Sequence, residues 1–375
     1  QAFFLDMEAL NIHPDIYCFA TGHIPEIVEL IEKLKKKGYA YTIDDGVYYD
    51  VSKFDEYGKL SGQKKEELVK HRVEPNPNKR NPGDFALWKF KKPGEPSWPS
   101  PWGEGRPGWH IECSAMSSKY LGQQFDIHGG GNDLIFPHHE NEIAQSEAAF
   151  GKKPWVRYWL HTGFLNIRGE KMSKSLGNII PIREALKRWD ASVLRLFFVS
   201  KHYRSPIDFR EEYLEETKES LERIYTLLEK LDKLELLTSI SEEETVVLKR
   251  VQTAKDDFEK AMDDDFNTPK ALAVVFGLVK DLNKFIENKK SISERLKKEI
   301  DSFFEMFSYV FGIPKRKKRR FEEETVQKLI NTLIKIRNEL RKKREFKLAD
   351  EIRNEMKKAG IELEDTPTGT EWKFL

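Results

Sequence analysis

The segment that most constrains the fold is FDIHGGGNDLIFPHHENE, because it joins a short apolar strand to a helix through three consecutive glycines. We expect the strand over Phe125–His128 and a turn at Gly129–Gly131. Pro137 suits the first turn of a helix, which is predicted to end at about Phe150, before Gly151. A strand, a glycine turn and a helix in this order place a ligand at the carboxyl edge of a parallel sheet, so the sequence predicts an α/β fold with a binding site there.

Three side chains near this segment are of the types that bind a metal ion. His138 and Glu142 are four residues apart, so they project from the same face of the predicted helix. Cys113, on a preceding helix, would add a thiolate, and this mixture of sulfur, nitrogen and oxygen donors favours zinc with one tetrahedral position left open. The alternative is a surface His–Glu pair and an inert, buried cysteine. His139 and Glu140 are expected to point away from the metal.

A second motif, Lys171–Ser175 (KMSKS), is of a type that handles phosphate. Its two lysines are three residues apart with a hydroxyl between them, so the loop can fold over a triphosphate and stabilise the charge that develops as pyrophosphate departs. An exposed basic loop explains most Lys/Ser pentapeptides, but a given pentapeptide occurs by chance in such a chain with a probability on the order of 10⁻⁴. Asp133, which follows the glycines, is placed to accept the hydroxyls of a ribose. A metal site beside a nucleotide site predicts an enzyme that activates a small substrate with ATP.

Composition and charge limit the partners. The chain has no run of eighteen apolar residues, so no transmembrane helix is expected, and its two cysteines, Cys18 and Cys113, indicate a reducing cytosol rather than a disulfide framework. Residues 315–375 hold 18 Lys and Arg against 12 Asp and Glu, a local charge of +6 within a chain of net charge +1. A polyanionic partner that meets this end would explain the excess, and so would a lysine-rich exposed helical surface.

The remaining sequence predicts further parts. Residues 1–52 fit the end of an α/β unit with a hairpin turn at Asp45-Gly46, and Trp159–Ile167 fits a strand that leads to the lysine–serine motif. Beyond Ile182 apolar residues recur at helical spacing, and after the basic run Lys315–Arg320 two more helices and a small hairpin are expected. We therefore expect four parts: a domain with an insertion over 1–165, a connecting region over 166–200, a helical bundle over 201–313 and a basic module over 314–375.

These motifs resemble class I aminoacyl-tRNA synthetases, and among them the cysteinyl-tRNA synthetase family. KMSKS is the second signature of that class, and GWHIECSAM (108–116), residues 125–146 and MDDDFNTPKA (262–271) resemble stretches peculiar to the family. The resemblance covers nearly all 375 residues, down to LEDTPTGTEW (363–372). It implies a Rossmann-like catalytic domain, incomplete at its N-terminus, followed by an α-helical bundle and a small C-terminal helical or mixed module.

The resemblance also assigns an amino-acid site. Cys113, His138 and Glu142 match three ligands of the family's zinc ion, one per chain, which binds the thiol of the substrate L-cysteine. A thiolate coordinates zinc strongly and a hydroxyl does not, so serine is rejected without an editing domain. Trp109 and His128 match residues that line the amino-acid pocket.

A nucleotide site and a nucleic-acid partner follow in the same way. Gly130 and Asp133 match the adenosine-binding segment, for ATP as a substrate together with Mg²⁺. The ATP-binding loop is matched by Lys171, Met172, Ser173, Lys174 and Ser175, with the two lysines acting on the phosphates. The C-terminal helices match the anticodon-binding region, so tRNA(Cys) is the expected partner of a cytoplasmic monomer that does not meet a membrane.

One departure concerns the beginning of the chain. The family starts with a strand and helix that carry a fourth zinc ligand, a cysteine, and the HIGH signature. Residues His23–Glu26 (HIPE) resemble that signature only superficially, since they lie in a segment that the family has much later. About a hundred residues are therefore expected to be missing from the front, judging by family length. A chain without them is not expected to catalyse.

Two other functions fit part of this sequence. A paralogous group resembles this family but joins activated cysteine to an amino sugar in thiol biosynthesis, and such a ligase would not need the basic C-terminal module. A catalytically inert, tRNA-binding fragment is the second alternative, and the intact KMSKS motif argues against it.

Overall fold

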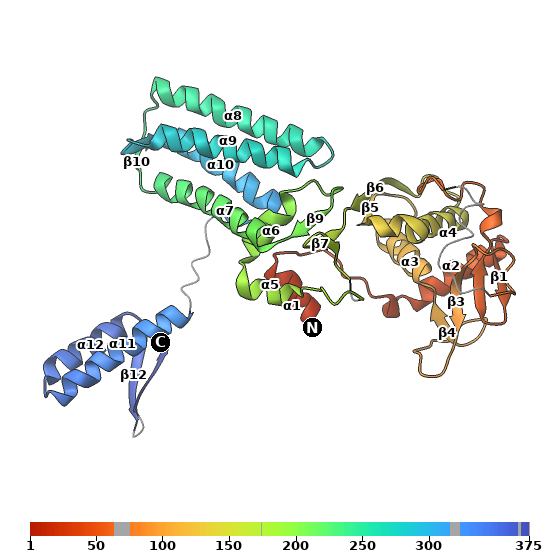
Figure 1. Cartoon of the computed structure of the whole chain (residues 1–375), viewed down its shortest axis with the longest axis horizontal. Helices are drawn as coiled ribbons and strands as arrows, with labels where there is room; N and C mark the ends of the chain where they lie inside the picture. Colours follow the sequence, from red (N-terminus) through yellow and green to blue (C-terminus); the bar gives the residue numbers. More distant parts are fainter. Residues whose placement is uncertain (64–75, 174, 316–322, 367–368, 375) are drawn as a thin grey trace. The chain divides into compact units, whose positions relative to one another are not determined.

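The structure is a computed structural model that describes residues 1–63, 76–173, 175–315, 323–366 and 369–374. It divides into two compact units, Gln1–Lys315 and Arg316–Leu375, which we call the N-terminal and C-terminal units. Within the N-terminal unit an α/β part precedes a connecting region and a helical bundle (Figure 1). In the part of the chain that the structure describes, no helix is both long enough and apolar enough to cross a membrane.

The α/β part has its own apolar core, built around three helices. These are α2 (Ile24–Lys36), α3 (Trp109–Leu121) and α4 (Glu140–Phe150). In α2, Ile27, Ile31 and Leu34 are fully buried at helical spacing, and the helix packs against both α3 and α4. The helix predicted over residues 109–121 is confirmed, and Gly122 ends it with a φ of +89°.

An antiparallel sheet covers this core. Its strands, in order, are β1 (Ala40–Ile43), β2 (Gly46–Tyr49), β3 (Phe85–Phe90) and β4 (Gly105–Pro107). The predicted hairpin is confirmed, but its turn lies one residue earlier than expected, because Ile43 pairs with Gly46 and leaves Asp44 and Asp45 as the two turn residues. Trp88 of β3 is fully buried, and the segment after residue 76 is therefore an ordered part of the domain.

A parallel pair of strands, β5 (Phe125–Gly131) and β6 (Val156–Thr162), lies beside α3 and α4. The turn predicted at Gly129–Gly131 is wrong, because the three glycines continue β5, with Gly130 opposite His161. A β-carbon on Gly130 would lie 2.8 Å from His139 Cε1, so the glycine permits a close approach to a side chain rather than a turn. The chain turns after β5, through helical turns over Asn132–His139 that lead into α4.

The connecting region holds a three-stranded sheet and two helices. The strands are β7 (Leu165–Ile167), β8 (Glu170–Lys171) and β9 (Ile207–Phe209), and the helices are α5 (Ile182–Arg188) and α6 (Ala191–Val199). The strand predicted over Trp159–Ile167 is divided between β6 and β7. It breaks because the backbone N–H of Gly163 donates to the carbonyl of Tyr203 at 2.7 Å instead of continuing the ladder of β6. The N-terminal helix α1 (Ala2–Ala9) is followed by Leu10, whose carbonyl accepts a bond from Arg195 of α6.

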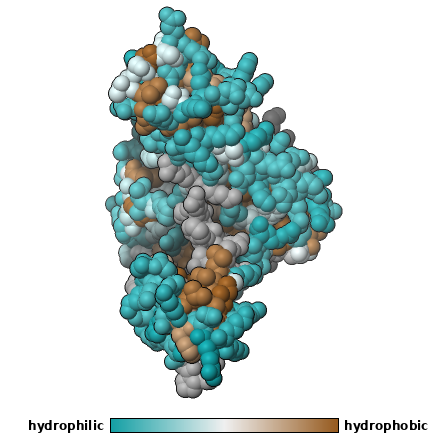
Figure 2. Space-filling model, turned by 90° about the vertical axis from the view of Figure 1, so that its left-hand side faces the viewer, coloured by the Kyte–Doolittle hydropathy of each residue, from teal (hydrophilic) through white to brown (hydrophobic). Residues whose placement is uncertain are grey.

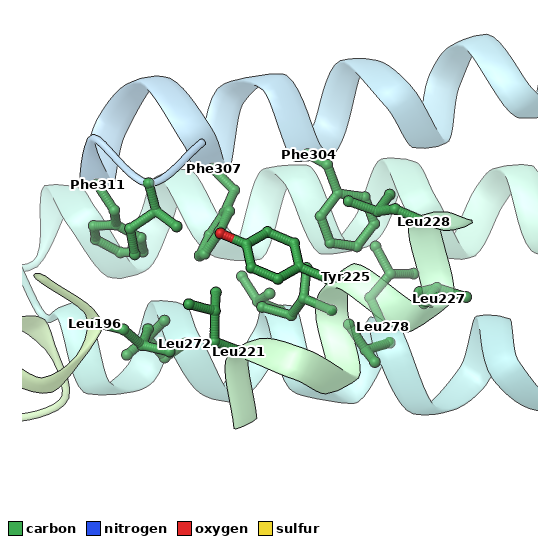
Figure 3. Close-up of a cluster of buried hydrophobic side chains, with 14 of the residues drawn as sticks. Leu196, Leu221, Tyr225, Leu227, Leu228, Leu272, Leu278, Phe304, Phe307 and Phe311 are labelled. Atoms are coloured by element: carbon green, nitrogen blue, oxygen red, sulfur yellow. The ribbon is translucent and has the colours of Figure 1, made fainter. Parts of the chain in front are cut away.

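A helical bundle completes the N-terminal unit. Its members are α7 (Glu211–Leu231), α8 (Glu242–Asp263), α9 (Thr268–Ile286) and α10 (Glu294–Phe311), with a short parallel pairing of β10 (Glu235–Leu237) and β11 (Ser291–Ser293). Figure 3 shows how Leu228, Leu278 and Phe304 meet from different helices in its apolar core. Ser241 caps α8 in a capping box with Glu244.

The C-terminal unit consists of two helices and a hairpin, as predicted. Its elements are α11 (Glu323–Lys342), α12 (Phe346–Lys358), β12 (Ile361–Thr366) and β13 (Gly369–Phe374). Its core is small, formed by Ile330, Ile334, Met356 and Leu363. Figure 2 shows apolar side chains gathered on one face of this unit. Its exposed apolar residues include Leu333 and Leu348. Residues 316–320 of the predicted basic linker lie outside the described residues.

Candidate active site and metal centre

Helices α3 and α4 bring the three predicted metal ligands together. Cys113 lies on α3, and His138 and Glu142 lie on the turn that leads into α4 and on α4 itself. One ligand atom from each residue lies within 4.8 Å of the other two. The two helices lie side by side in Figure 1. A buried hydrogen bond of 2.6 Å from Gln145 Nε2 to Ser114 Oγ joins them next to the site.

The carboxylate of Glu142 is fully buried and is oriented toward imidazoles. His128 Nε2 lies 3.1 Å from one of its oxygens and His138 Nε2 lies 3.3 Å from the other. Within the described residues neither oxygen has a partner with the geometry of a hydrogen bond. Buried carboxylate oxygens without hydrogen bonds, next to a thiol and an imidazole, are typical of a site that binds a metal cation.

Burial and the nearby imidazoles set the charges of these ligands. Burial acts to raise the pKa of Glu142, but the contacts with His128 and His138 lower it to about 2, so the group is a carboxylate at neutral pH. Burial and the negative charge of Glu142 raise the pKa of the Cys113 thiol. A bound metal cation would counter both influences and favour the thiolate, since metal ligation requires a deprotonated cysteine.

The second nitrogen of His138 is already engaged. Its Nδ1 lies 2.8 Å from His110 Nδ1, so Nε2 is left to face Glu142 and a metal. Burial lowers the pKa of His110 to about 3, which keeps this partner neutral. Trp109, predicted as a pocket residue, stacks on His138 with ring centroids 4.4 Å apart and remains 58% exposed, so its indole is available to a ligand.

A second group of imidazoles adjoins the first. His128, His139 and Glu142 also bring ligand atoms within 4.8 Å of one another. His139 Nδ1 lies 2.8 Å from His161 Nε2, and burial lowers the pKa of His139 to about 4. Contrary to expectation, His139 therefore faces the site, because the helical turn before α4 directs both adjacent histidines inward. Glu140 does point away, since it accepts backbone N–H groups from residues 58–61.

Sequence reasoning missed His110, His139 and His161. A signal for His161 exists, because β5 and β6 are parallel neighbours and His161 pairs in register with Gly130. Residues at the carboxyl ends of two adjacent parallel strands meet at one edge of the sheet. His110 follows Trp109 on α3, and its position depends on the packing of that helix against α4, which spacing alone does not give.

The glycine segment and the lysine–serine motif also meet. Lys171 Nζ lies 3.7 Å from Asp133 Oδ2, and both side chains are about half exposed. Gly130 of β5 precedes Asp133 by three residues, and the His139 ring leaves no room for a β-carbon on this glycine. The two predicted parts of a nucleotide site are therefore adjacent, at the same edge of the β5–β6 pair as the imidazoles.

The lysine–serine loop is held from within. The backbone N–H of Ser173 donates to Asn178 Oδ1 at 2.8 Å, and Asn178 donates to the carbonyl of Lys171. Ser173 and Ser175 bring their hydroxyls within 3.1 Å, and the N–H of Met172 bonds to β7. Lys174, predicted to act on phosphates, lies outside the described residues.

The class of protein follows from comparison of this fold and site with known proteins. Residues 1–219 match the catalytic-domain family described as tRNA synthetases class I (C), and residues 257–314 match the DALR domain. Methionyl-tRNA synthetase of Mycobacterium tuberculosis, solved with methionyl-adenylate, superposes with a TM-score of 0.56 over 80% of this chain and 73% of that chain at 16% identity. A putative arginyl-tRNA synthetase from Campylobacter jejuni gives 0.53 over 84% and 67% at 14% identity. The fold is that of a class I aminoacyl-tRNA synthetase.

Sequence comparison narrows the class to one family. The cysteine–tRNA ligase of Thermococcus gammatolerans is 54% identical over 381 residues, which cover 100% of this chain and 80% of that protein. That of Methanococcus maripaludis is 48% identical over 382 residues, with the same coverage. The chain belongs to the cysteine–tRNA ligase family, and the resemblance found in its motifs is confirmed.

Proposed function

We propose that the protein activates L-cysteine with ATP and transfers it to tRNA(Cys), with one zinc ion selecting the substrate thiol. The observation that carries this proposal is the convergence of Cys113, His138 and Glu142, whose buried carboxylate has no hydrogen-bond partner among the described residues. The names of the relatives at 48–54% identity support the same reaction.

The donor set explains the choice of amino acid. Cys113, His138 and Glu142 would hold the zinc, and a zinc ion with three protein ligands supplies a soft Lewis acid that prefers a thiolate to a hydroxyl. Trp109 and His128 flank these ligands and would bound the pocket for the rest of the amino acid. Serine, which lacks the soft donor, would be rejected at binding.

The nucleotide side of the site would carry out charge stabilisation. The carboxylate of cysteine attacks the α-phosphorus of ATP, the bond to the oxygen shared with the β-phosphate breaks, and pyrophosphate leaves. A bound Mg²⁺ would neutralise part of the phosphate charge. Gly130 and Asp133 would hold the adenosine, while Lys171, Lys174 and the loop between them would contact the phosphates. The acyl group then passes to a ribose hydroxyl of tRNA and AMP leaves. No covalent enzyme intermediate is required, so positioning and electrostatics supply the rate.

The tRNA is assigned to the helical parts. The DALR match over residues 257–314 and the +6 charge of residues 315–375 support the proposal that residues 201–313 and 314–375 contact tRNA. The region up to 165 would bind cysteine and adenosine, and residues 166–200 would carry the lysine–serine loop and the connection. A cytoplasmic monomer fits these assignments. Neither an amino-sugar acceptor nor an inert fragment is favoured by the relatives.

The decisive test replaces one cysteine at a time in the full-length protein. In the Cys113→Ser variant we expect zinc content to fall from about one ion per chain to less than a tenth, with loss of cysteine-dependent ATP–pyrophosphate exchange. The matched control is Cys18→Ser, since Cys18 is an exposed free cysteine away from the cluster. Zinc measured by atomic absorption at equal levels in both variants and the parent would contradict the ligand assignment.

A further inference from the structure

We propose that Asp265, on the turn between α8 and α9, is a positioning residue for Lys171 of the lysine–serine loop. The inference rests on the proposed function, because it assigns a support to the lysine that contacts phosphate. The two residues lie in different parts of the N-terminal unit, and a continuous series of contacts joins them.

The first contacts hold the turn to the segment that follows α6. Asp265 accepts bonds from Arg204 Nε at 2.6 Å and Arg204 Nη2 at 3.1 Å, and from the hydroxyl of Tyr203 at 2.7 Å. Asp265 and Phe266 both have left-handed backbones, with φ of +54° and +52°. Two adjacent residues other than glycine in this region cost free energy, so the turn is kept in this shape by what it contacts.

The second contact joins that segment to the end of β6. The carbonyl of Tyr203 accepts the N–H of Gly163 at 2.7 Å. A β-carbon on Gly163 would lie 2.3 Å from the backbone of Ser205, so the backbones of these two segments are in direct contact, with no side chain between them. The position of Gly163 therefore follows the position of the Tyr203 carbonyl.

The third contact reaches the lysine. Phe164 follows Gly163, and its carbonyl accepts the N–H of Ile207 at 3.0 Å. Lys171 Nζ lies 3.8 Å from the centroid of the Phe164 ring. The same nitrogen lies 3.7 Å from Asp133 Oδ2. The ammonium group is thus fixed by a ring whose backbone is bonded on both sides to the segment that Asp265 holds.

These contacts make Asp265 a support for the geometry of phosphate binding. A group that stabilises developing charge must stay close to its productive position, and a displacement of about 1 Å can reduce a rate by up to a hundredfold. Asp265 itself does not touch the site. Its side chain is 42% exposed, so its removal leaves no cavity in the core of the bundle.

The test uses the full-length protein and two measurements. Asp265→Asn removes the charge that holds Arg204, and we expect kcat of cysteine-dependent ATP–pyrophosphate exchange to fall about tenfold with unchanged zinc content. In a Lys171→Ala background the same substitution should change kcat less than twofold, because its effect passes through the lysine. The matched control is Asp264→Asn, since the Asp264 side chain makes, within the described residues, one ion pair, with Lys270 at 3.8 Å.

The second measurement is independent of activity. Acetylation of Lys171 by an amine reagent, followed by mass spectrometry, should be at least about threefold faster in Asp265→Asn than in the parent or in Asp264→Asn. If Asp265→Asn does not fold, Tyr203→Phe removes one bond to Asp265 and should raise the labelling rate in the same direction. Equal labelling in parent and variants, or a tenfold loss that persists without Lys171, would overturn the proposal. If the parent protein has no exchange activity, but Lys171 is still labelled faster in Asp265→Asn, the proposed function is contradicted and the positioning role of Asp265 is retained.

Discussion

Glu142 determines the electrostatics of the site at the scale of single residues. It is buried among imidazoles of which His110 and His139 have pKa values lowered by burial to about 3 and 4. These rings are neutral at physiological pH, so they offer lone pairs rather than charge. Glu142 therefore brings a full negative charge next to the neutral ring of His139, and this combination attracts a divalent cation.

Gly130 allows a prediction for a single residue. A methyl group there meets His139 at 2.8 Å and Leu134 Cδ1 at 2.9 Å, so Gly130→Ala should turn the imidazole out of place and reduce cysteine-dependent exchange by about tenfold or more. The matched control is Gly129→Ala in the same strand, where the nearest atom is the Leu160 carbonyl oxygen at 3.4 Å. Steady-state exchange assays compare the two. Similar activity in both variants would show that the close approach of Gly130 does not matter.

Spacing made part of this residue-level picture predictable. His138 and Glu142 are separated by one helical turn, so their side chains lie on the same face of the helix however that helix packs. The partnership of Cys113 with them was a hypothesis about donor types, and the three do converge. His110 and His139 could not be assigned in this way, because their roles depend on how α3 meets α4 and on the helical turn before α4.

At the scale of elements, two arginines of α11, Arg337 and Arg341, hold the C-terminal hairpin through Asp365. Arg337 is 1% exposed and donates two bonds to Asp365 of β12, at 2.7 and 2.8 Å. The bond from Arg337, ahead of all other influences, holds the pKa of Asp365 well below its usual range. Removal of the carboxylate would leave a guanidinium buried without its partner.

Acid should therefore loosen this hairpin. Because the folded-state pKa of Asp365 is lowered, its contribution to stability is complete above about pH 5 and is lost progressively as the pH falls below that value. Protection factors of β12 and β13 amides, measured by hydrogen exchange, should be constant from pH 7 to 5 and then fall. Asp365→Ala should lower the opening free energy by about 1–2 kcal/mol at neutral pH, since the carboxylate is partly exposed, and should weaken this dependence.

A neighbouring ion pair provides the control for this prediction. Glu364 precedes Asp365 and pairs with Lys373 across the hairpin, with both side chains more than half exposed. Glu364→Ala should cost less than about 1 kcal/mol, as exposed pairs do. A pH dependence that is the same in Asp365→Ala and in the parent would show that the carboxylate is not responsible.

Helices and strands whose apolar residues recur at regular spacing were predictable from the sequence, and elements without such spacing were not. The helices α3, α11 and α12 and the C-terminal hairpin follow from apolar spacing and turn residues. The three glycines at the end of β5 have no side chains, so the sequence shows no alternation of apolar and polar residues there. A strand therefore cannot be distinguished from a turn at these positions. The break between β6 and β7 was equally hidden, since it arises from a bond to Tyr203, forty residues further along the chain.

At the scale of the whole molecule, the two units have cores of very different size. The apolar core of the bundle extends through α7 to α10, whereas the C-terminal unit buries, among its described residues, five apolar side chains and Arg337. A small core supports only a few kilocalories of stability, so we expect this unit to open without the rest of the chain.

Hydrogen exchange can separate the two openings. Amides of α11 and α12 should exchange with an opening free energy of about 3–5 kcal/mol or less, and amides of α7 and α9 with a clearly larger one. Ile330→Ala should weaken only the C-terminal unit, and Val275→Ala in α9 only the bundle, since both side chains are buried in their own cores. A single common opening free energy for all four helices would exclude independent units.

Two glycines near the lysine–serine loop differ in how freely they can vary. Gly177 has open space around its α-carbon but a φ of +65°, so asparagine, which tolerates that backbone, is an acceptable replacement. At Gly163 the obstacle is volume, because the backbone of Ser205 occupies the place of any β-carbon. Gly177 can therefore be substituted, whereas Gly163 cannot. A mutational scan of this region should find that no other residue is tolerated at position 163.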